Sequence, residues 1–315
     1  MTKQVKNLKH LQSEIDSALS LIKNKGSVLN GDGISKKGLI TGTESLLERC
    51  RSIVIAKQKA KPSMRTIHHF ACSGGTLISK CISSMPNVFL LSEMHPYTQM
   101  FPPSGKPLYL PTDIVSQIKY AKLPLNKELS LKLFTNNIVT VSKHLRKIGG
   151  TLIIREHTHS EYCLSDMVHK TKTLISCLSS EFNIESIVTI RDPIDSYSSL
   201  VKNNWVTFNP QSFDEYCKRY LCFLEDYADC SVFKYEDFVE EPIEQIKNIC
   251  KSLKVEFCED FLDIFPLIKL SGDSGRTSDS ISFRKNNVPS YIKNEALKSS
   301  HYHLFCDRFN YRNIL

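Results

Sequence analysis

A loop of small residues follows the first strand-like apolar segment of this chain. The loop contains two glycines and two hydroxyl side chains. Residues 72–77 read Cys-Ser-Gly-Gly-Thr-Leu and lead into a stretch with helical periodicity. Adjacent glycines, Gly74 and Gly75, let the backbone turn tightly and approach a ligand closely. The first amides of a helix lack partners within it and lie at its positive end, so this turn can bind an anion such as phosphate. The alternative is an ordinary strand-to-helix turn that Ser73 caps.

An arginine stands at the end of a later strand-like segment. Arg191 precedes Asp192 and Pro193, which suit the N-cap and the first position of a helix. Ser199 comes eight residues after Arg191, about two turns into that helix, and can face the same ligand. A guanidinium and a hydroxyl together can hold a phosphate. The alternative is that Arg191 pairs with Asp195 on the surface.

Candidate acid–base groups follow two other strand-like segments. Glu93 comes after the apolar residues 88–91, and His157 stands in the run Arg155-Glu-His-Thr-His. A carboxylate can accept a proton, and the unperturbed pKa of histidine lies near neutrality. His95 is a weaker third candidate. The alternatives are a surface Glu93 and a His157 that only orders its loop. The histidines and glutamates of these loops have no spacing diagnostic of a metal site, so no metal is expected.

Short apolar runs alternate with helical stretches from residue 65 onward. Because these runs are rich in Ile, Val and Phe without strict alternation, they are typical of buried parallel strands. Strands are expected at 66–72, 87–91, 151–155, 184–190 and 231–234. Helices are expected at 76–84, 127–147, 171–180, 193–203, 212–227 and 242–253. The pattern predicts an α/β fold, a doubly wound parallel sheet of about five strands with helices on both faces, and ligands bind beyond the carboxyl ends of such strands.

The composition of the 315 residues limits the classes of protein to consider. Hydrophobic residues make up 41% of the chain, which argues against a disordered or collagen-like protein. The net charge of +8 comes without a dense basic run, so a nucleic-acid partner is not expected. No apolar run approaches the roughly 20 residues of a membrane span, and the N-terminus lacks the features of a secretory signal. The eleven cysteines are scattered without a C-x-x-C pair, which indicates reduced packing residues in the cytoplasm.

Two regions of the chain differ in pattern. Residues 1–62 include apolar side chains at intervals of three and four and are expected to form a helical extension. Residues 63–315 are expected to form the α/β domain. The alternatives for the extension are an appendage and a dimerisation element, and the second would give a homodimer.

The motifs together resemble those of the sulfotransferases that use 3′-phosphoadenosine 5′-phosphosulfate (PAPS). That family has a strand–[KR]SGTT–helix loop for the 5′-phosphosulfate, and later an Arg with a Ser eight residues on for the 3′-phosphate. Residues 72–77 and the pair Arg191 and Ser199 correspond to these motifs. Residues 235–242, Tyr-Glu-Asp-Phe-Val-Glu-Glu-Pro, are similar to the family's Y-E-D-[LF]-x-x-x-P segment. The resemblance covers roughly residues 65–255 and implies a P-loop-like sulfotransferase fold.

The resemblance also implies roles for individual residues. The cofactor loop comprises Cys72, Ser73, Gly74, Gly75, Thr76 and Leu77. Glu93 matches the catalytic carboxylate of the Golgi carbohydrate and tyrosyl-protein branches, whereas His157 matches the base of the cytosolic branch. The sequence departs from the family at two positions. A Lys or Arg that contacts the leaving group usually stands at the place of Cys72, and a Thr of the family's SGTT stands at the place of Gly75. Arg155 is the expected substitute cation, and Lys80 is a less suitable one because it lies two turns into the helix.

A late loop rich in Gly and Ser completes the expected cofactor site. In the family such a loop carries basic residues that close over the 3′-phosphate, and Arg276, Arg284 and Lys285 are the candidates here. The alternative is a solvated basic loop. The Pro- and Tyr-rich residues 93–123 are expected to help form the acceptor pocket.

These observations predict transfer of a sulfuryl group from PAPS to a hydroxyl, with a carbohydrate as the expected acceptor. A P-loop-type kinase is one alternative, although the loop lacks the G-K-[ST] of a Walker A motif. A catalytically degenerate nucleotide-binding protein is the other alternative, because a thiol at Cys72 cannot supply a positive charge.

Overall fold

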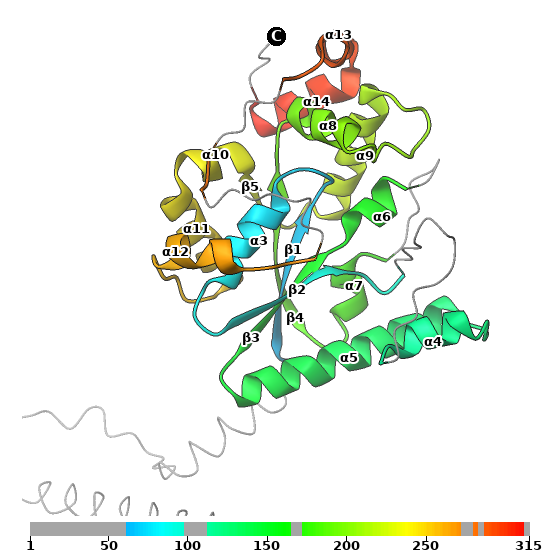
Figure 1. Ribbon diagram of the computed structural model, residues 1–315, viewed down its shortest axis with the longest axis vertical. Helices are drawn as coiled ribbons and strands as arrows, with labels where there is room; N and C mark the ends of the chain where they lie inside the picture. The colour runs from blue at the N-terminus through cyan, green and yellow to red at the C-terminus, as the bar shows by residue number, and fades with distance from the viewer. Residues whose placement is uncertain (1–60, 98–111, 165–171, 272–279, 283–286, 312–315) are drawn as a thin grey trace, which may run out of the picture. The chain divides into compact units, whose positions relative to one another are not determined.

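The computed structural model describes residues 61–97, 112–164, 172–271, 280–282 and 287–311 (Figure 1). These residues belong to the unit Lys61–Leu315. The helical extension expected at residues 1–62 lies almost wholly outside the described residues and stays a prediction.

A parallel sheet forms the centre of the described unit (Figure 1). Its strands are β1 (Ser63–His69), β2 (Val88–Met94), β3 (Thr151–Glu156), β4 (Asn183–Ile190) and β5 (Ser231–Lys234). They lie in the order β2-β3-β1-β4-β5, and every neighbouring pair is parallel. The expected α/β fold with a parallel sheet of five strands is therefore confirmed.

Helices pack on both faces of this sheet (Figure 1). The helices of the described residues are α3 (Gly75–Ser83), α4 (Ile114–Tyr120), α5 (Lys127–Lys147), α6 (Thr158–Tyr162), α7 (Leu174–Leu178), α8 (Pro193–Lys202), α9 (Phe213–Asp226), α10 (Tyr235–Glu240), α11 (Pro242–Leu253), α12 (Phe261–Ile264), α13 (Ser290–Lys298) and α14 (Ser300–Phe309), with a 3₁₀ turn at Phe265–Leu267. The expected bounds of α5 and α11 are correct. The helix expected at 171–180 is wrong in length, because the Thr173 side chain caps it by accepting from the Ser176 amide and it ends at Leu178.

Two strands end at other residues than the sequence predicts. β1 stops at His69 rather than Cys72, because Cys72 has φ of 61° and the Ser73 amide donates to the Phe70 carbonyl in a turn. β2 continues past Leu91 to Met94. Glu93 thus lies within β2 rather than after it, at a register irregularity against β3.

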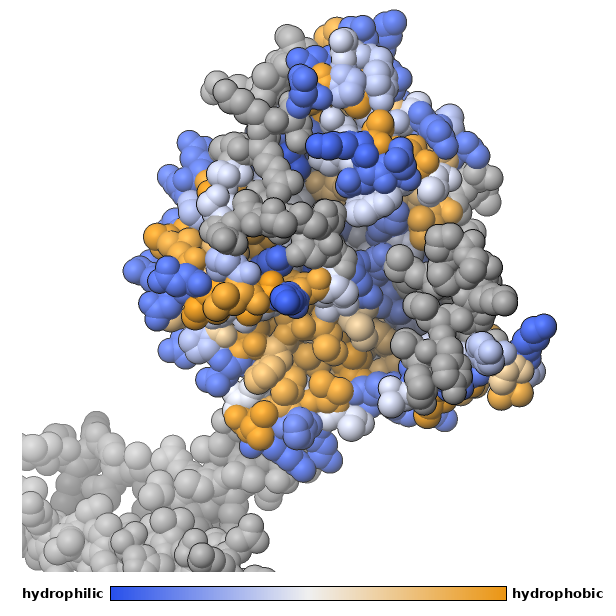
Figure 2. All heavy atoms as spheres, viewed as in Figure 1, coloured by the Kyte–Doolittle hydropathy of each residue, from blue (hydrophilic) through white to orange (hydrophobic). Residues whose placement is uncertain are grey.

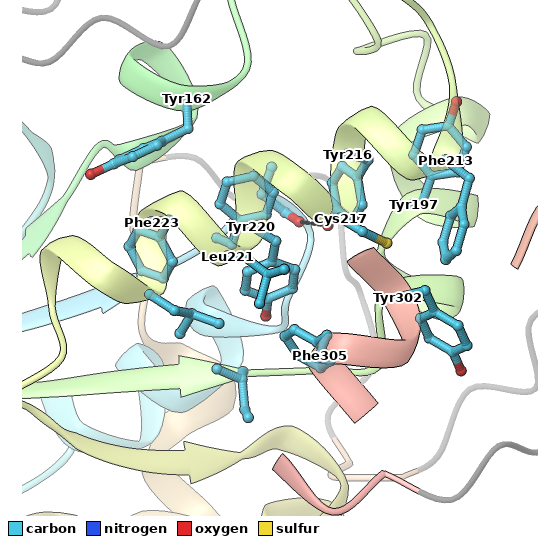
Figure 3. Close-up of a cluster of buried hydrophobic side chains, with 14 of the residues drawn as sticks. Tyr162, Tyr197, Phe213, Tyr216, Cys217, Tyr220, Leu221, Phe223, Tyr302 and Phe305 are labelled. Carbon is cyan, nitrogen blue, oxygen red and sulfur yellow. Dashed lines mark hydrogen bonds between the residues drawn. The ribbon is translucent and has the colours of Figure 1, made fainter. Parts of the chain in front are cut away.

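Alternation along the strands divides the core into two layers. Ile67 and Ile153 face α3, α10, α11 and α12. Met64, Leu152 and Ile154 face α5 and α7. A third cluster, built largely from aromatic residues of α9, packs beyond the end of β1 (Figure 3).

β2 is an edge strand of the sheet. Apolar side chains gather over this part of the surface in Figure 2, and Phe89 of β2 is 45% exposed. Among the described residues, no helix has the length and apolar character that a membrane crossing needs. The cysteines of the described ranges are free thiols, and most of them are buried, as expected of small packing residues.

Candidate active site

The candidate residues of four strands gather because parallel strands end at one edge of a sheet. Cys72 follows β1, Glu93 lies at the end of β2, His157 follows β3 and Arg191 follows β4. β1 lies between β3 and β4, so its loop is flanked by the other two. The topology thus brings the predicted cofactor and acid–base residues to the same edge.

The loop after β1 is packed so tightly that only glycine fits at two positions. Gly74 has φ of 82°, and a Cβ there would lie 2.2 Å from Cδ2 of Tyr235. A Cβ on Gly75 would lie 2.3 Å from Cγ of His69. Both glycines therefore let neighbouring rings lie against the backbone at the start of α3.

Ser73 does not cap α3, so the alternative of a turn that Ser73 caps is wrong on this point. Gly74 occupies the N-cap of α3, so no side chain at that position caps the helix. The Ser73 side chain is buried, and its hydroxyl donates to the Phe70 carbonyl at 2.8 Å. The hydroxyl stabilises the turn that precedes α3, and the start of that helix is its positive end.

Cys72 adopts the left-handed backbone conformation with φ of 61°. Burial raises the pKa of its thiol to about 12, although the Arg191 guanidinium and a hydrogen bond with Asn203 act in the opposite direction. The thiol is protonated at neutral pH. The position therefore carries no charge in the loop that is expected to bind an anion.

The loop after β4 has the predicted local structure. The Asp192 carboxylate accepts from the Ile194 amide at 2.8 Å, and Pro193 occupies the first turn of α8. Arg191 Nη2 lies 3.3 Å from Asp195 Oδ2, and the Ser199 hydroxyl donates to the Asp195 carbonyl at 2.9 Å. Both Arg191 and Ser199 thus contact Asp195. The ion pair of Arg191 with Asp195, which was the alternative to phosphate binding, is present beside the two residues predicted to bind phosphate.

Tyr235 joins the loop after β1 to the loop after β4. Its ring occupies the space where Gly74 would carry a Cβ, and the Arg191 guanidinium lies 4.8 Å from the ring centroid. The two candidate anion-binding elements are therefore neighbours. Tyr235 begins the Tyr-Glu-Asp segment that the sequence analysis singled out.

Two tyrosines of α9, Tyr216 and Tyr220, form hydrogen bonds with both loops (Figure 3). The Tyr216 hydroxyl donates to the Ala71 carbonyl at 2.9 Å. The Tyr220 hydroxyl accepts from the Arg191 amide at 3.1 Å. Sequence reasoning assigned these tyrosines no role, although their spacing of four residues places them on one face of a helix.

Glu93, Arg155 and His157 form a second group of contacts. Arg155 Nη2 donates to Glu93 Oε1, and His157 Nε2 lies 3.2 Å from Glu93 Oε2. Burial raises the pKa of Glu93, and the Arg155 charge opposes that rise. Burial, with the charges of His159 and Arg155, lowers the pKa of His157 to about 4. His157 is therefore neutral near pH 7, and its Nε2–H donates to the Glu93 carboxylate.

Arg155 is enclosed by the ends of β1 and β2. It is 2% exposed, its Nη1 donates to the Ser92 hydroxyl at 2.7 Å and the Ser271 carbonyl at 3.2 Å, and its Nη2 lies 3.2 Å from His69 Nε2. Glu93 has φ of 58°, a conformation that costs energy for a residue with a side chain. The Arg155 guanidinium, which also contacts these other groups, holds the side chain of Glu93 in place.

A separate polar network lies on the opposite face of the sheet. Glu156 is buried and accepts from His68 Nδ1 and the Tyr227 hydroxyl, both at 2.5 Å, and from the Leu174 amide at 3.1 Å. Although burial alone would raise the pKa of Glu156, His68 and the other partners lower it overall. His95 Nε2 lies 3.7 Å from Glu156, so this weaker acid–base candidate belongs to the network behind Glu93.

Buried nitrogen atoms without a partner mark the same edge of the sheet. Among the described residues, His69 Nδ1, His157 Nδ1 and Arg191 Nε have no hydrogen-bond partner. These residues stand at the carboxyl ends of β1, β3 and β4. Because buried polar atoms are nearly always paired, three unpaired nitrogens at one edge point to a site that a ligand or ordered water completes.

The late basic loop contains three of the predicted cofactor-binding residues. Arg276, Arg284 and Lys285 lie outside the described residues, as does part of the expected acceptor region at 93–123. Within the described ranges, no group of three His, Cys, Asp or Glu side chains is arranged to hold a metal ion.

Comparisons with known proteins give matches only among solved structures. No protein-family model matches the sequence, and no curated protein matches it. The sulfotransferase domain of the curacin biosynthetic pathway is 16% identical with a TM-score of 0.47, and the alignment covers 80% of this chain and 98% of that one. The chain is similar to sulfotransferases.

Two further solved structures that the chain matches are also sulfotransferases. The sulfotransferase domain of the Synechococcus PCC 7002 olefin synthase is 16% identical with a TM-score of 0.46, covering 81% of this chain and 97% of that one. Mouse sulfotransferase SULT7A1, solved in complex with PAP, is 12% identical with a TM-score of 0.41, covering 81% and 87%.

Proposed function

We propose that this chain is a sulfotransferase that moves a sulfuryl group from PAPS to a hydroxyl acceptor. The observation that carries the proposal is the contact of Tyr235 with both the Gly74 turn and Arg191. It makes neighbours of two candidate anion-binding elements, as a nucleotide with two separate phosphate groups requires. The turn at residues 72–77 would bind the 5′-phosphosulfate, and Arg191 with Ser199 would bind the 3′-phosphate.

Glu93 is the proposed base. Its carboxylate would take the acceptor's proton as the acceptor oxygen bonds to sulfur, while the bond from sulfur to the phosphate oxygen breaks and that phosphate leaves with the electron pair. Transfer of this kind depends on positioning and on stabilising charge. His157, whose Nε2–H donates to Glu93, would position the carboxylate rather than accept the proton itself.

The first experiment is calorimetry of the full chain with PAP, the desulfonated nucleotide. We expect micromolar or tighter binding by the natural protein and loss of binding in Arg191→Ala. Arg146→Ala, on the exposed surface of α5, is the matched control. Absence of PAP binding by the natural protein would refute the proposal.

The second experiment measures sulfuryl transfer with labelled PAPS to a panel of glycans and other hydroxyl compounds. A carbohydrate acceptor is the finer part of the proposal. Glu93→Gln should abolish turnover while PAP binding remains, whereas Glu240→Gln, on the surface of α10, should leave both unchanged. His157→Gln retains an amide donor for Glu93 and should keep part of the activity.

The neutral thiol of Cys72 supports a second candidate, a nucleotide-binding protein without catalysis. In that case the natural protein binds PAP, transfers no sulfuryl group to any acceptor of the panel, and gains transfer in Cys72→Lys.

A further inference from the structure

His69 is a buried imidazole that the proposed function has not yet used. It is the last residue of β1 and directly precedes the turn into α3. Its side chain packs so closely on Gly75 that a Cβ there would lie 2.3 Å from the imidazole Cγ. The ring is thus part of the wall of the candidate phosphosulfate loop.

Arg155 fixes which imidazole nitrogen of His69 carries the proton. Arg155 Nε and Nη2 lie 3.3 and 3.2 Å from His69 Nε2. A guanidinium has only donors, so Nε2 must be the acceptor and the proton must lie on Nδ1. Burial, followed by the charge of Arg155, holds the pKa of His69 well below its usual value, which keeps the ring neutral.

The protonated nitrogen has no partner. Within the part of the chain that the structure describes, His69 Nδ1 is buried and makes no hydrogen bond. An unpaired buried N–H is costly, and native proteins retain one chiefly where function or an ordered water uses it. The donor lies in a ring that touches the start of α3, where the helix already favours an anion.

The loop also lacks a charge-bearing donor of its own. Cys72 stands where the proposed reaction needs a group to contact the leaving phosphate, and its thiol is neutral. His69 is backed by the buried guanidinium of Arg155. A polarised N–H in this place would supply a strong hydrogen bond without a lysine in the loop.

We propose that His69 Nδ1–H donates to the anionic group bound at residues 72–77 and replaces the cation that Cys72 does not provide. This inference rests on the proposed function. Nδ1 is closed to solvent, so the bond requires the surroundings of the ring to shift when the anion enters. Arg155 acts through His69 by fixing its tautomer.

Three substitutions separate the donor from its structural surroundings. His69→Gln keeps an acceptor for Arg155 at the position of Nε2 but removes the donor at Nδ1. His69→Asn places an amide donor near Nδ1 and gives up the acceptor for Arg155. His144→Gln, at an exposed position of α5, is the control for a histidine-to-glutamine change. Thermal melting checks that each variant is folded.

Calorimetry with PAP and PAPS then gives the decisive comparison. We expect His69→Gln to weaken nucleotide binding about tenfold or more, and His69→Asn to weaken it less, because hydrogen bonds to charged groups are strong. A loss for both nucleotides would place the donor at the 5′-phosphate, and a loss for PAPS alone would place it at the sulfuryl group. Either result supports the inference.

Unchanged binding of both nucleotides by folded His69→Gln would overturn the inference and leave the proposed function intact. Failure of the natural protein to bind PAP would instead refute the proposed function. Nitrogen-15 spectra of the histidine-labelled full chain give a test without nucleotide. They should show His69 as the neutral Nδ1–H tautomer, and an Nε2–H tautomer or a cationic ring would overturn the inference.

Discussion

Replacing glycines one at a time should separate backbone strain from steric conflict in the loop after β1. Gly149 has φ of 81° and nothing within 4 Å of an added Cβ, so alanine there meets strain alone. Gly75 meets the His69 ring without a positive φ, and Gly74 meets both problems. Left-handed backbone costs an alanine about 1–2 kcal/mol, and overpacking costs about 1–3 kcal/mol.

The expected order of destabilisation follows from these values. Gly149→Ala should cost about 1 kcal/mol and Gly74→Ala about 2–5 kcal/mol. Gly75 begins α3, so its alanine gains up to about 1 kcal/mol of helix propensity, which leaves a net cost of about 0–3 kcal/mol. In the Gly75→Ala, His69→Ala double variant the added methyl group has room, so the two costs should not add.

The assay is urea unfolding followed by fluorescence. Trp205 is the single tryptophan of the chain and lies after α8 with its ring centroid 6.0 Å from that of His159, so the signal reports this unit alone. Additive effects of Gly75→Ala and His69→Ala, within about 0.5 kcal/mol, would refute the steric argument.

Two further predictions concern a buried carboxylate, Glu156, and a half-buried one, Asp192. Glu156 has a lowered pKa, so its contribution to stability is present above the unfolded value near 4.5 and is lost as the pH falls through the folded value. At pH 7, Glu156→Gln should therefore lower the free energy of unfolding by about 3 kcal/mol, because it breaks a buried pair, and lower the melting temperature. The difference in melting temperature from the natural protein should shrink below pH 4.5. A difference that stays constant with pH would contradict this. Burial raises the pKa of Asp192 to about 7 from 3.8, so the stability of the natural protein decreases as the pH rises between these values. Asp192→Asn still caps α8, and at pH 8 it should be more stable than the natural protein by up to about 4 kcal/mol and melt at a higher temperature. At pH 3.5 the two proteins should melt alike. A lower melting temperature of the variant at pH 8 would count against the role of burial.

The sequence predicted the strands well because buried parallel strands are apolar throughout. It misplaced the ends of β1 and β2, where Cys72 and Glu93 adopt positive φ. Tertiary contacts impose that conformation, since Arg155 holds Glu93 and the Tyr235 and His69 rings crowd the loop after β1. Such contacts join residues far apart in the chain and leave no local signal.

The sequence also predicted that Glu93, His157 and Arg191 stand at the carboxyl ends of strands, as they do in the structure, because the topology of parallel strands determines where their loops lie. It gave no sign of the contact between His69 and Arg155, although the adjacent histidines at the end of β1 were visible. It missed the pairing of Glu156 with His68 as well. Which of two neighbouring side chains faces which layer depends on strand register, and the sequence alone does not fix that register.

The two polar pairs of β1 and β3 have a consequence for how these strands assemble. His69 and Arg155 lie on one face of the sheet, and His68 and Glu156 form their pair on the other. A slip of one residue between β1 and β3 would leave a guanidinium and a carboxylate buried without their partners. The two polar pairs therefore favour a single alignment of β1 and β3 during folding. A one-residue deletion in either strand should prevent assembly of the sheet rather than only impair the site.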